Sequence, residues 1–323
     1  MSRLIIFCFL LFTWFPFVGS KAQNYAIVVH GGAGNISPSE MDEATRKAYQ
    51  DKLVEATQAG LSILEKGGSS LDAVETAVKI LEDSPLFNAG KGAVFNAEGK
   101  NELDASIMCG KSLEAGSVAG VTTIKNPISA ARMVMEHSPH VMLIGKGAET
   151  FAQEHGLEIV PPEYFYDAAR YNQYLEFKKG TPDKNQKKGT VGAVALDIHG
   201  NLAAATSTGG MLGKKYGRVG DSPIIGAGTY ANNNSCAVSA TGHGEYFIRL
   251  NVAFRIAALM EFGMLSLKEA SERVIFTDLN ALGGTGGIIA VDKNGNIAMP
   301  FNTEGMFRAW GDQSGKIIVL MGQ

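Results

Sequence analysis

Thr190 combines a reactive side chain with an unusual setting in this sequence. Residues 178–189 carry five lysines with glycine, proline and asparagine, and a run of apolar and β-branched residues begins immediately after Thr190. A threonine at this point has an ordinary explanation, because threonine favours the first residues of strands. Alternatively, the chain is cut before Thr190. The freed α-amine, with a pKa of about 7.7–8, would then serve the hydroxyl as its general base. Local pattern alone favours the ordinary explanation.

Other familiar catalytic motifs are absent. Gly32 and Gly34 follow a predicted strand, but Ser37 stands where a dinucleotide-binding loop needs glycine. Neither Gly90-Lys91 nor Gly145-Lys146 is followed by Ser or Thr, as a phosphate-binding loop requires. The sequence has no His-Glu-x-x-His, Cys-x-x-Cys or Gly-x-Ser-x-Gly motif. A serine triad or a zinc enzyme therefore has no support.

The composition is that of a globular protein. Hydrophobic residues make up 45% of the chain, which is enough for a full core and excludes a disordered protein. The formal net charge is −3, so no basic field is available and we expect no nucleic-acid partner. The length allows two domains or one large layered domain.

The first 22 residues have the pattern of a signal peptide. A basic start at Arg3 precedes an uncharged stretch that is too short to span a membrane and contains Pro16. Ser20 and Ala22 are the small residues expected before a cleavage site. We therefore expect an exported protein, periplasmic or secreted, with no membrane contact after residues 1–22 are removed. Cys109 and Cys236 then remain, and buried thiols are favoured over a disulfide.

Helical and β patterns fall in separate blocks. The stretch 40–66 has helical composition, and Ser69 with Asp72 caps a second helix. Ser266 and Glu269 form a capping box for a later helix. Two hairpins are predicted, over 190–208 and 288–299, each with an Asp ending its first strand and Gly-Asn starting its second. This arrangement indicates an α+β layered fold and not alternating βαβ units.

Several separated stretches together resemble one enzyme family. They are Val29-His30-Gly31-Gly32-Ala33-Gly34, residues 85–95, residues 189–197, residues 203–210, residues 217–223 and Thr241-Gly242-His243-Gly244-Glu245. In this order they resemble the plant-type L-asparaginase/isoaspartyl peptidase family of N-terminal nucleophile (Ntn) hydrolases. The resemblance favours the cleaved-threonine alternative.

The resemblance implies a four-layer αββα sandwich and a precursor that cuts itself between Gly189 and Thr190. The products are an α subunit of residues 23–189, ending in a flexible linker over 178–189, and a β subunit of residues 190–323. A dimer of such heterodimers is the implied assembly.

The resemblance also implies roles for individual residues. Thr190 is the nucleophile, and Thr208, Thr241, Gly242 and Asn88 complete the catalytic set. Thr208 bonds the nucleophile, Thr241 and the Gly242 N–H form the oxyanion hole, and Asn88 reaches the amine of the nucleophile. The substrate-binding residues are Arg218 for the α-carboxylate, Asp221 for the α-ammonium and Gly244. From the residues alone, Arg218 and Asp221 could instead form a local surface ion pair.

The implied substrates are L-asparagine and β-aspartyl dipeptides, with no catalytic cofactor. A structural sodium ion is implied, bound by the backbone carbonyls of Leu81, Glu82, Ser84, Phe87, Ala89 and Lys91. Two alternatives stay open: an aspartylglucosaminidase-like hydrolase of glycoasparagines, and a secreted binding module without activity. Gly189 argues against the first, because aspartylglucosaminidases carry Asp before the nucleophile.

Overall fold

The computed structural model describes residues 24–35, 41–180 and 189–322. The predicted signal peptide, residues 1–22, lies outside the described residues, as do residues 181–188 of the predicted linker. The elements are β1 (Ala26–Gly34), α1 (Glu43–Glu65), α2 (Ser70–Glu82), η2 (Gly90–Gly92), β2 (Leu103–Cys109), β3 (Ala115–Val121), α3 (Pro127–His137), β4 (Met142–Ile144), α4 (Gly145–Glu154), η3 (Pro162–Phe165), α5 (Ala168–Lys178), β5 (Val191–Leu196), β6 (Leu202–Thr208), β7 (Thr229–Ala231), β8 (Cys236–Gly242), α6 (Gly244–Leu250), α7 (Val252–Glu261), α8 (Leu267–Glu272), the π-helical η4 (Arg273–Leu279), β9 (Gly286–Asp292), β10 (Ile297–Ala298), β11 (Gly305–Asp312) and β12 (Ile317–Leu320).

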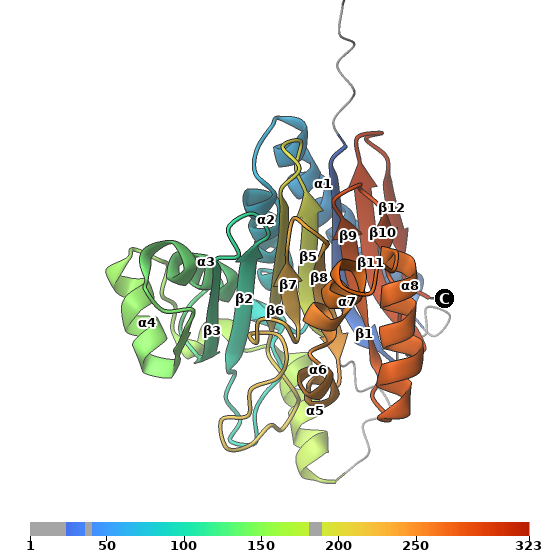
Figure 1. Ribbon diagram of the computed structural model, residues 1–323. Helices are drawn as coiled ribbons and strands as arrows, with labels where there is room; N and C mark the ends of the chain where they lie inside the picture. Colours follow the sequence, from blue (N-terminus) through green and yellow to red (C-terminus); the bar gives the residue numbers. More distant parts are fainter. Residues whose placement is uncertain (1–23, 36–40, 181–188, 323) are drawn as a thin grey trace, which may run out of the picture.

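Two stacked sheets form the centre of the fold. The larger sheet has the order β12-β11-β1-β5-β6-β2-β3-β4, and the smaller sheet has the order β10-β9-β8-β7. Helices α1, α2 and α3 cover the outer face of the larger sheet, while α7 and α8 cover that of the smaller one (Figure 1). The predicted α+β fold, a four-layer αββα sandwich, is confirmed.

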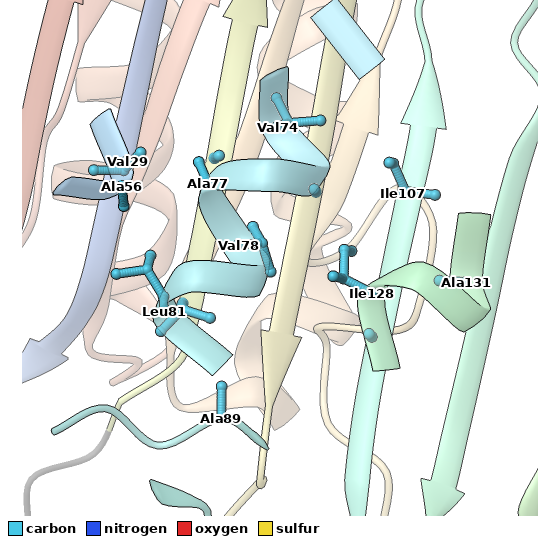
Figure 2. Close-up of a cluster of buried hydrophobic side chains, with 14 of the residues drawn as sticks. Val29, Ala56, Val74, Ala77, Val78, Leu81, Ala89, Ile107, Ile128 and Ala131 are labelled. Atoms are coloured by element: carbon cyan, nitrogen blue, oxygen red, sulfur yellow. The ribbon is translucent and has the colours of Figure 1, made fainter. Parts of the chain in front are cut away.

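The helix-facing core explains the sequence pattern of α2. Val74, Val78 and Leu81 recur at helical spacing, so they share one face, and all three are fully buried. Figure 2 shows this face of α2 beside Ile107 of β2 and Ile128 of α3. Ser69 caps the helix as predicted, accepting the Asp72 N–H at 3.1 Å.

Strand β5 is buried on both of its faces. Ala193 and Ala195 belong to the core under the helices, whereas Val194 and Leu196 belong to the core between the sheets. This is why its sequence reads as a continuous apolar run without alternation. The rigid strand fixes the position of Thr190, the residue directly before it.

Some elements differ from the predictions. Helix α5 was not predicted, and Lys178 is its last residue, so the predicted linker begins inside a helix. The capping box of Ser266 and Glu269 is present, but the helix that it starts passes into the π-helical η4. Cys109 and Cys236 are both free thiols. Among the described residues, no helix is long and apolar enough to cross a membrane.

Candidate active site

Thr190 and Thr208 face each other across the β5–β6 hairpin. The antiparallel register pairs Val191 with Ser207, which places the residue before β5 beside the last residue of β6. Thr190 Oγ1 donates to Thr208 Oγ1 at 3.1 Å, and Thr190 is only 7% exposed. Hairpin register therefore brings two hydroxyls together at a nearly enclosed position.

The carbonyl of Gly189 is held by two donors. Asn88 Nδ2 donates to it at 2.8 Å, and Thr208 Oγ1 lies at a donor distance of 3.4 Å. The Gly210 N–H donates to Thr208 Oγ1 at 3.0 Å, and the Gly210 carbonyl accepts the same Asn88 amide at 2.8 Å. In the uncut chain, Asn88 thus contacts the carbonyl side of the Gly189–Thr190 peptide bond.

Gly32 lets β1 pass directly beside this peptide bond. Its φ of +112° is a conformation that side chains disfavour. A Cβ at this position would lie 2.7 Å from Gly189 Cα and 3.3 Å from the Thr190 nitrogen. The glycine-rich end of β1 is therefore required for the close approach.

The predicted oxyanion residues lie at the end of β8. Thr241 is buried, and its Oγ1 accepts the Ala33 N–H at 3.2 Å. A hydroxyl that accepts one hydrogen bond still has its own proton to donate. Gly242 lines the same pocket as Thr190. Gly242 therefore lies at this pocket, whereas Thr241, buried directly before it, is not among the residues that line it.

Arg218 binds a carboxylate that the sequence analysis missed. Its Nε and Nη2 donate to Oε1 and Oε2 of Glu245, at 2.9 Å each. The partner is therefore Glu245 of α6, and not Asp221 three residues along the chain. Glu245 follows the recognised Thr241–Gly244 motif, but only the fold shows that it meets Arg218.

Asp221 is buried next to Arg218 without a full set of partners. Its Oδ2 accepts no hydrogen bond from the described residues. Burial raises the pKa of Asp221 to about 7, against the attraction of Arg218 and a hydrogen bond from its own backbone. A Cβ on Gly244 would lie 2.8 Å from Asp221 Oδ1 and 2.9 Å from Arg218 Nη2. Gly244, which has no Cβ, thus leaves space between these two groups.

One pocket is lined by Thr190 together with Arg218 and Asp221. The predicted site residues that line it are Asn88, Gly189, Thr190, Thr208, Arg218, Asp221 and Gly242. Met211, Leu212 and His243 also line it, as does Gln173 of α5, for which the sequence predicted no role. The pocket thus brings a threonine hydroxyl together with side chains of both charges.

His30 is a buried neighbour that lacked a predicted role. Its Nε2 is 3.0 Å from Ser239 Oγ, whose other contact is Thr206 Oγ1 at 2.7 Å. Burial lowers the pKa of His30 to about 3, so the imidazole is neutral at physiological pH. It lies against Gly192 of β5, and among the described residues its side chain forms no hydrogen bond with the Thr190 hydroxyl.

The loop predicted to bind sodium presents main-chain oxygens. Gly90, with φ +50°, packs against the Glu82 carbonyl, and Gly92 packs against the carbonyl of Phe87, in both cases too closely for a Cβ. The carbonyls of Leu81 and Ala89 accept local turn hydrogen bonds, from Ser84 and Gly92. Backbone oxygens in a tight loop are suitable donors for a hard cation. The six predicted ligands therefore fit a sodium ion by donor type.

The Glu82 side chain is engaged elsewhere. Its Oε1 accepts the Ser207 hydroxyl at 2.6 Å and the Ile128 N–H at 3.0 Å. Burial raises the pKa of this carboxyl to about 8, while these two hydrogen bonds oppose the rise.

Among the described residues, no cluster of three or more His, Cys, Asp or Glu side chains could hold a metal ion.

The sequence is similar to one family of enzymes along nearly its whole length. The family model Asparaginase_2, described as asparaginase, matches residues 23–320. The isoaspartyl peptidase of Escherichia coli (strain K12) is 57% identical over 295 residues, covering 88% of this chain and 92% of that protein. The isoaspartyl peptidase/L-asparaginase of Mus musculus is 46% identical over 297 residues, covering 90% and 89%. A probable isoaspartyl peptidase/L-asparaginase 2 of Arabidopsis thaliana is 41% identical over 320 residues, covering 90% and 97%.

Proposed function

The chain belongs to the Asparaginase_2 family, and from this we propose that it hydrolyses β-aspartyl (isoaspartyl) dipeptides and L-asparagine, releasing L-aspartate. We propose further that Thr190 becomes its nucleophile by self-cleavage of the chain. The observation that carries this proposal is the Gly189 carbonyl, held by Asn88 beside the Thr190 hydroxyl.

Self-cleavage needs only groups that are already in place. Thr190 Oγ attacks the carbonyl carbon of Gly189, while Asn88 Nδ2 stabilises the negative charge that develops on the oxygen. The C–N bond then breaks, the nitrogen takes up the proton that the Thr190 hydroxyl has lost, and Gly189 is left as an ester on Thr190. Water hydrolyses the ester, which yields the carboxyl group of Gly189 and the free hydroxyl and amine of Thr190.

Turnover repeats this chemistry on the substrate. The α-amine of Thr190 accepts the hydroxyl proton as Oγ attacks the side-chain carbonyl of the aspartyl group. Thr241 and the Gly242 N–H stabilise the oxyanion. The protonated amine of Thr190 then gives this proton to the leaving group, which is ammonia from asparagine or the α-amine of the second residue of a dipeptide. Water then opens the aspartyl ester and regenerates Thr190.

The charged end of the pocket selects an aspartyl group. Arg218 offers donors in a planar fork that suits the α-carboxylate of the substrate. Asp221, when ionised, suits its α-ammonium. These two groups bind the same zwitterion in free asparagine and in β-aspartyl dipeptides, so one site serves both substrates.

Maturation, export and assembly complete the proposal. Residues 1–22 are removed as a signal peptide, and the exported chain becomes subunits of residues 23–189 and 190–323, which pair as a dimer of heterodimers. No chemical step is assigned to a metal or an organic cofactor. Sodium at the 81–91 loop supports the segment that carries Asn88, and replacing sodium with a large organic cation should lower the Tm.

Intact-mass analysis with a substrate panel tests this function. Wild-type protein should show two chains, the second beginning Thr-Val-Gly-Ala, and should hydrolyse a β-aspartyl dipeptide and asparagine but not a glycoasparagine. Thr190→Ala should stay uncut and inactive. Cleavage or turnover in that variant overturns the mechanism. A preference for the glycoasparagine would identify an aspartylglucosaminidase, and an uncut, inactive wild-type protein would identify a binding module.

A further inference from the structure

Lys214 is a buried lysine on the segment that follows β6. Its side chain is 2% exposed, and its Nζ donates to the Glu102 main-chain carbonyl at 3.0 Å. The carboxylate of Asp104 lies 3.6 Å from this Nζ, and that of Glu102 lies 3.8 Å from it. A charge removed from water in this way requires a compensating charge, because an isolated buried ion is strongly unfavourable.

Asp104 is the fully buried group that compensates Lys214. Its Oδ1 accepts the Gly120 N–H at 2.8 Å, whereas its Oδ2 accepts no hydrogen bond from the described residues. Burial raises the pKa of Asp104, and the nearby Lys214 is the main opposing influence. The chemistry proposed above uses neither residue.

The pair is in contact with the residues around the nucleophile. A Cβ on Gly210, whose φ is +78°, would lie 3.0 Å from Lys214 Nζ and 3.1 Å from its Cδ. Gly210 donates its N–H to Thr208 and offers its carbonyl to Asn88. Asp104 itself is paired with Thr208 in the register of β2 and β6. The Lys214 side chain therefore packs directly against Gly210.

We infer that Lys214 and Asp104 are a positioning pair, which holds residues 209–214 so that Gly210 orients Thr208 and Asn88 toward Thr190. The inference rests on the proposed function, since the oriented groups are those assigned to the nucleophile. Lys214 belongs to the proposed β subunit and Asp104 to the α subunit. The pair thus keeps the site aligned after the chain between the subunits is cut.

Charge-removing variants test this role. Lys214→Met keeps the length of the side chain but leaves Asp104 unpaired, and Asp104→Asn leaves Lys214 without its buried anion. Because a displacement of about 1 Å can cost about 100-fold in rate, each should lower kcat for a β-aspartyl dipeptide about 10- to 100-fold. KM should change less than about twofold, because the substrate clamp is intact. Self-cleavage should slow in parallel.

The double variant and a neighbouring lysine provide the controls. Lys214→Met with Asp104→Asn breaks the same pair, so its kcat should be about that of the more impaired single variant and well above the product of the two single effects. The exposed Lys215, changed to Met, should behave as wild type. The amount of mature enzyme is normalised by quantifying the chain that begins with Thr190, so incomplete folding or cleavage does not distort kcat.

The outcomes show whether the positioning role alone fails or whether the proposed function fails with it. If Lys214→Met lowers only the Tm and leaves kcat per mature site unchanged, the pair is structural and the inference is wrong. A double variant as impaired as the product of the single effects overturns it as well. If wild-type protein lacks turnover, the proposed function is refuted, and the positioning role in that reaction is refuted with it.

Discussion

Arg218 donates two hydrogen bonds of 2.9 Å to the carboxylate of Glu245. The carboxyl of Asp221 beside it is buried, and within the described part of the chain its Oδ2 has no hydrogen-bond partner. The Glu245 side chain is 46% exposed and the Arg218 side chain 19%. The pair holds the guanidinium plane at the pocket while part of its edge stays available. Glu245 thus orients the cation that we assign to the substrate carboxylate.

Arg218→Ala should separate substrate binding from maturation. Self-cleavage does not involve the substrate clamp, so the variant should mature normally. A hydrogen-bonded charge contributes about 1.5–3 kcal/mol, so KM should rise about 10- to 100-fold. Steady-state kinetics on mature protein measure this, with the exposed Arg249→Ala as the matched control. An unchanged KM would refute the assigned role, and Arg218→Lys should restore little of the loss.

Glu245→Gln should have a smaller effect in the same direction. The glutamine can still accept one hydrogen bond from Arg218, but the ion pair is lost. A partly exposed ion pair contributes up to about 1 kcal/mol, so KM should rise about two- to fivefold with kcat maintained. The loss should shrink at high salt, because wild-type pairing is itself screened there. A fall in kcat at constant KM would contradict an orienting role.

Asn88→Asp should slow self-cleavage specifically. Oδ1 of the native side chain accepts the Val94 N–H at 2.9 Å, and an aspartate keeps that acceptor. What it loses is the amide donor to the Gly189 carbonyl. Because removing one oxyanion donor costs about 100- to 1,000-fold in rate, the uncut chain should persist on a denaturing gel for correspondingly longer.

Asn96→Asp is the matched control for that change. Asn96 uses its Oδ1 to accept the N–H groups of Glu98 and Lys100, so the substitution preserves its contacts. It should mature at the wild-type rate. Equal delays in both variants would show that the Asn88 amide is not needed at the scissile carbonyl.

Asp221→Asn should make the folded protein more stable but should weaken substrate binding. Burial raises the pKa of Asp221 from 3.8 to about 7, so the folded chain holds this proton more tightly than the unfolded chain. Between these two values, stability must therefore fall as the pH rises, and above pH 7 the ionised carboxylate stays buried at full cost. The asparagine variant avoids this, so its Tm advantage over wild type should grow from pH 5 to pH 8.

Substrate binding, unlike stability, should favour the ionised form of Asp221. Wild-type KM should rise as the pH falls below about 7, because a protonated Asp221 cannot pair with the substrate ammonium. The variant should have a high KM with little pH dependence over this range. A wild-type KM that is constant from pH 5 to pH 8, together with an unchanged Tm difference, would contradict a buried titrating carboxylate.

The sequence predicted those parts of the site that depend on local pattern. The hairpin signature of β5 and β6 fixes the pairing of Thr190 with Thr208, and the capping residues of α2 and α8 were read correctly. The contacts of Arg218 with Glu245 and of Lys214 with Asp104 were missed. Each joins residues that only the packing of separate elements brings together, and charge alone does not choose among the many possible partners.

Helix α5 is a second feature of the site that its own sequence does not predict. Only Arg170 and Tyr174 of this helix are buried, so it buries no continuous apolar face and the helical period in its sequence is weak. Gln173 nevertheless reaches the pocket from this helix. Its role depends on where α5 docks, which its own sequence does not specify.

Gly32→Ala should block self-cleavage of the chain because the added methyl group clashes with the Gly189–Thr190 peptide. The added methyl would lie 2.7 Å from Gly189 Cα and 3.3 Å from the Thr190 nitrogen. Both are backbone atoms, which cannot move aside as the end of a flexible side chain can. The scissile carbonyl should therefore leave its position beside Asn88, and the chain should stay uncut. The strain of an alanine at φ +112° adds to this effect and must be measured separately.

Gly156→Ala measures that strain, because Gly156 has φ +76° and no atom within 4 Å of the added Cβ. Both variants should lose stability by about 1 kcal/mol or more through the backbone, but only Gly32→Ala should remain uncut on intact-mass analysis. If Gly32→Ala matures at the rate of Gly156→Ala, the closeness of β1 to the Gly189–Thr190 bond has no part in cleavage. If both stay uncut, the defect lies in folding and not at the bond, and the role given to Gly32 is wrong.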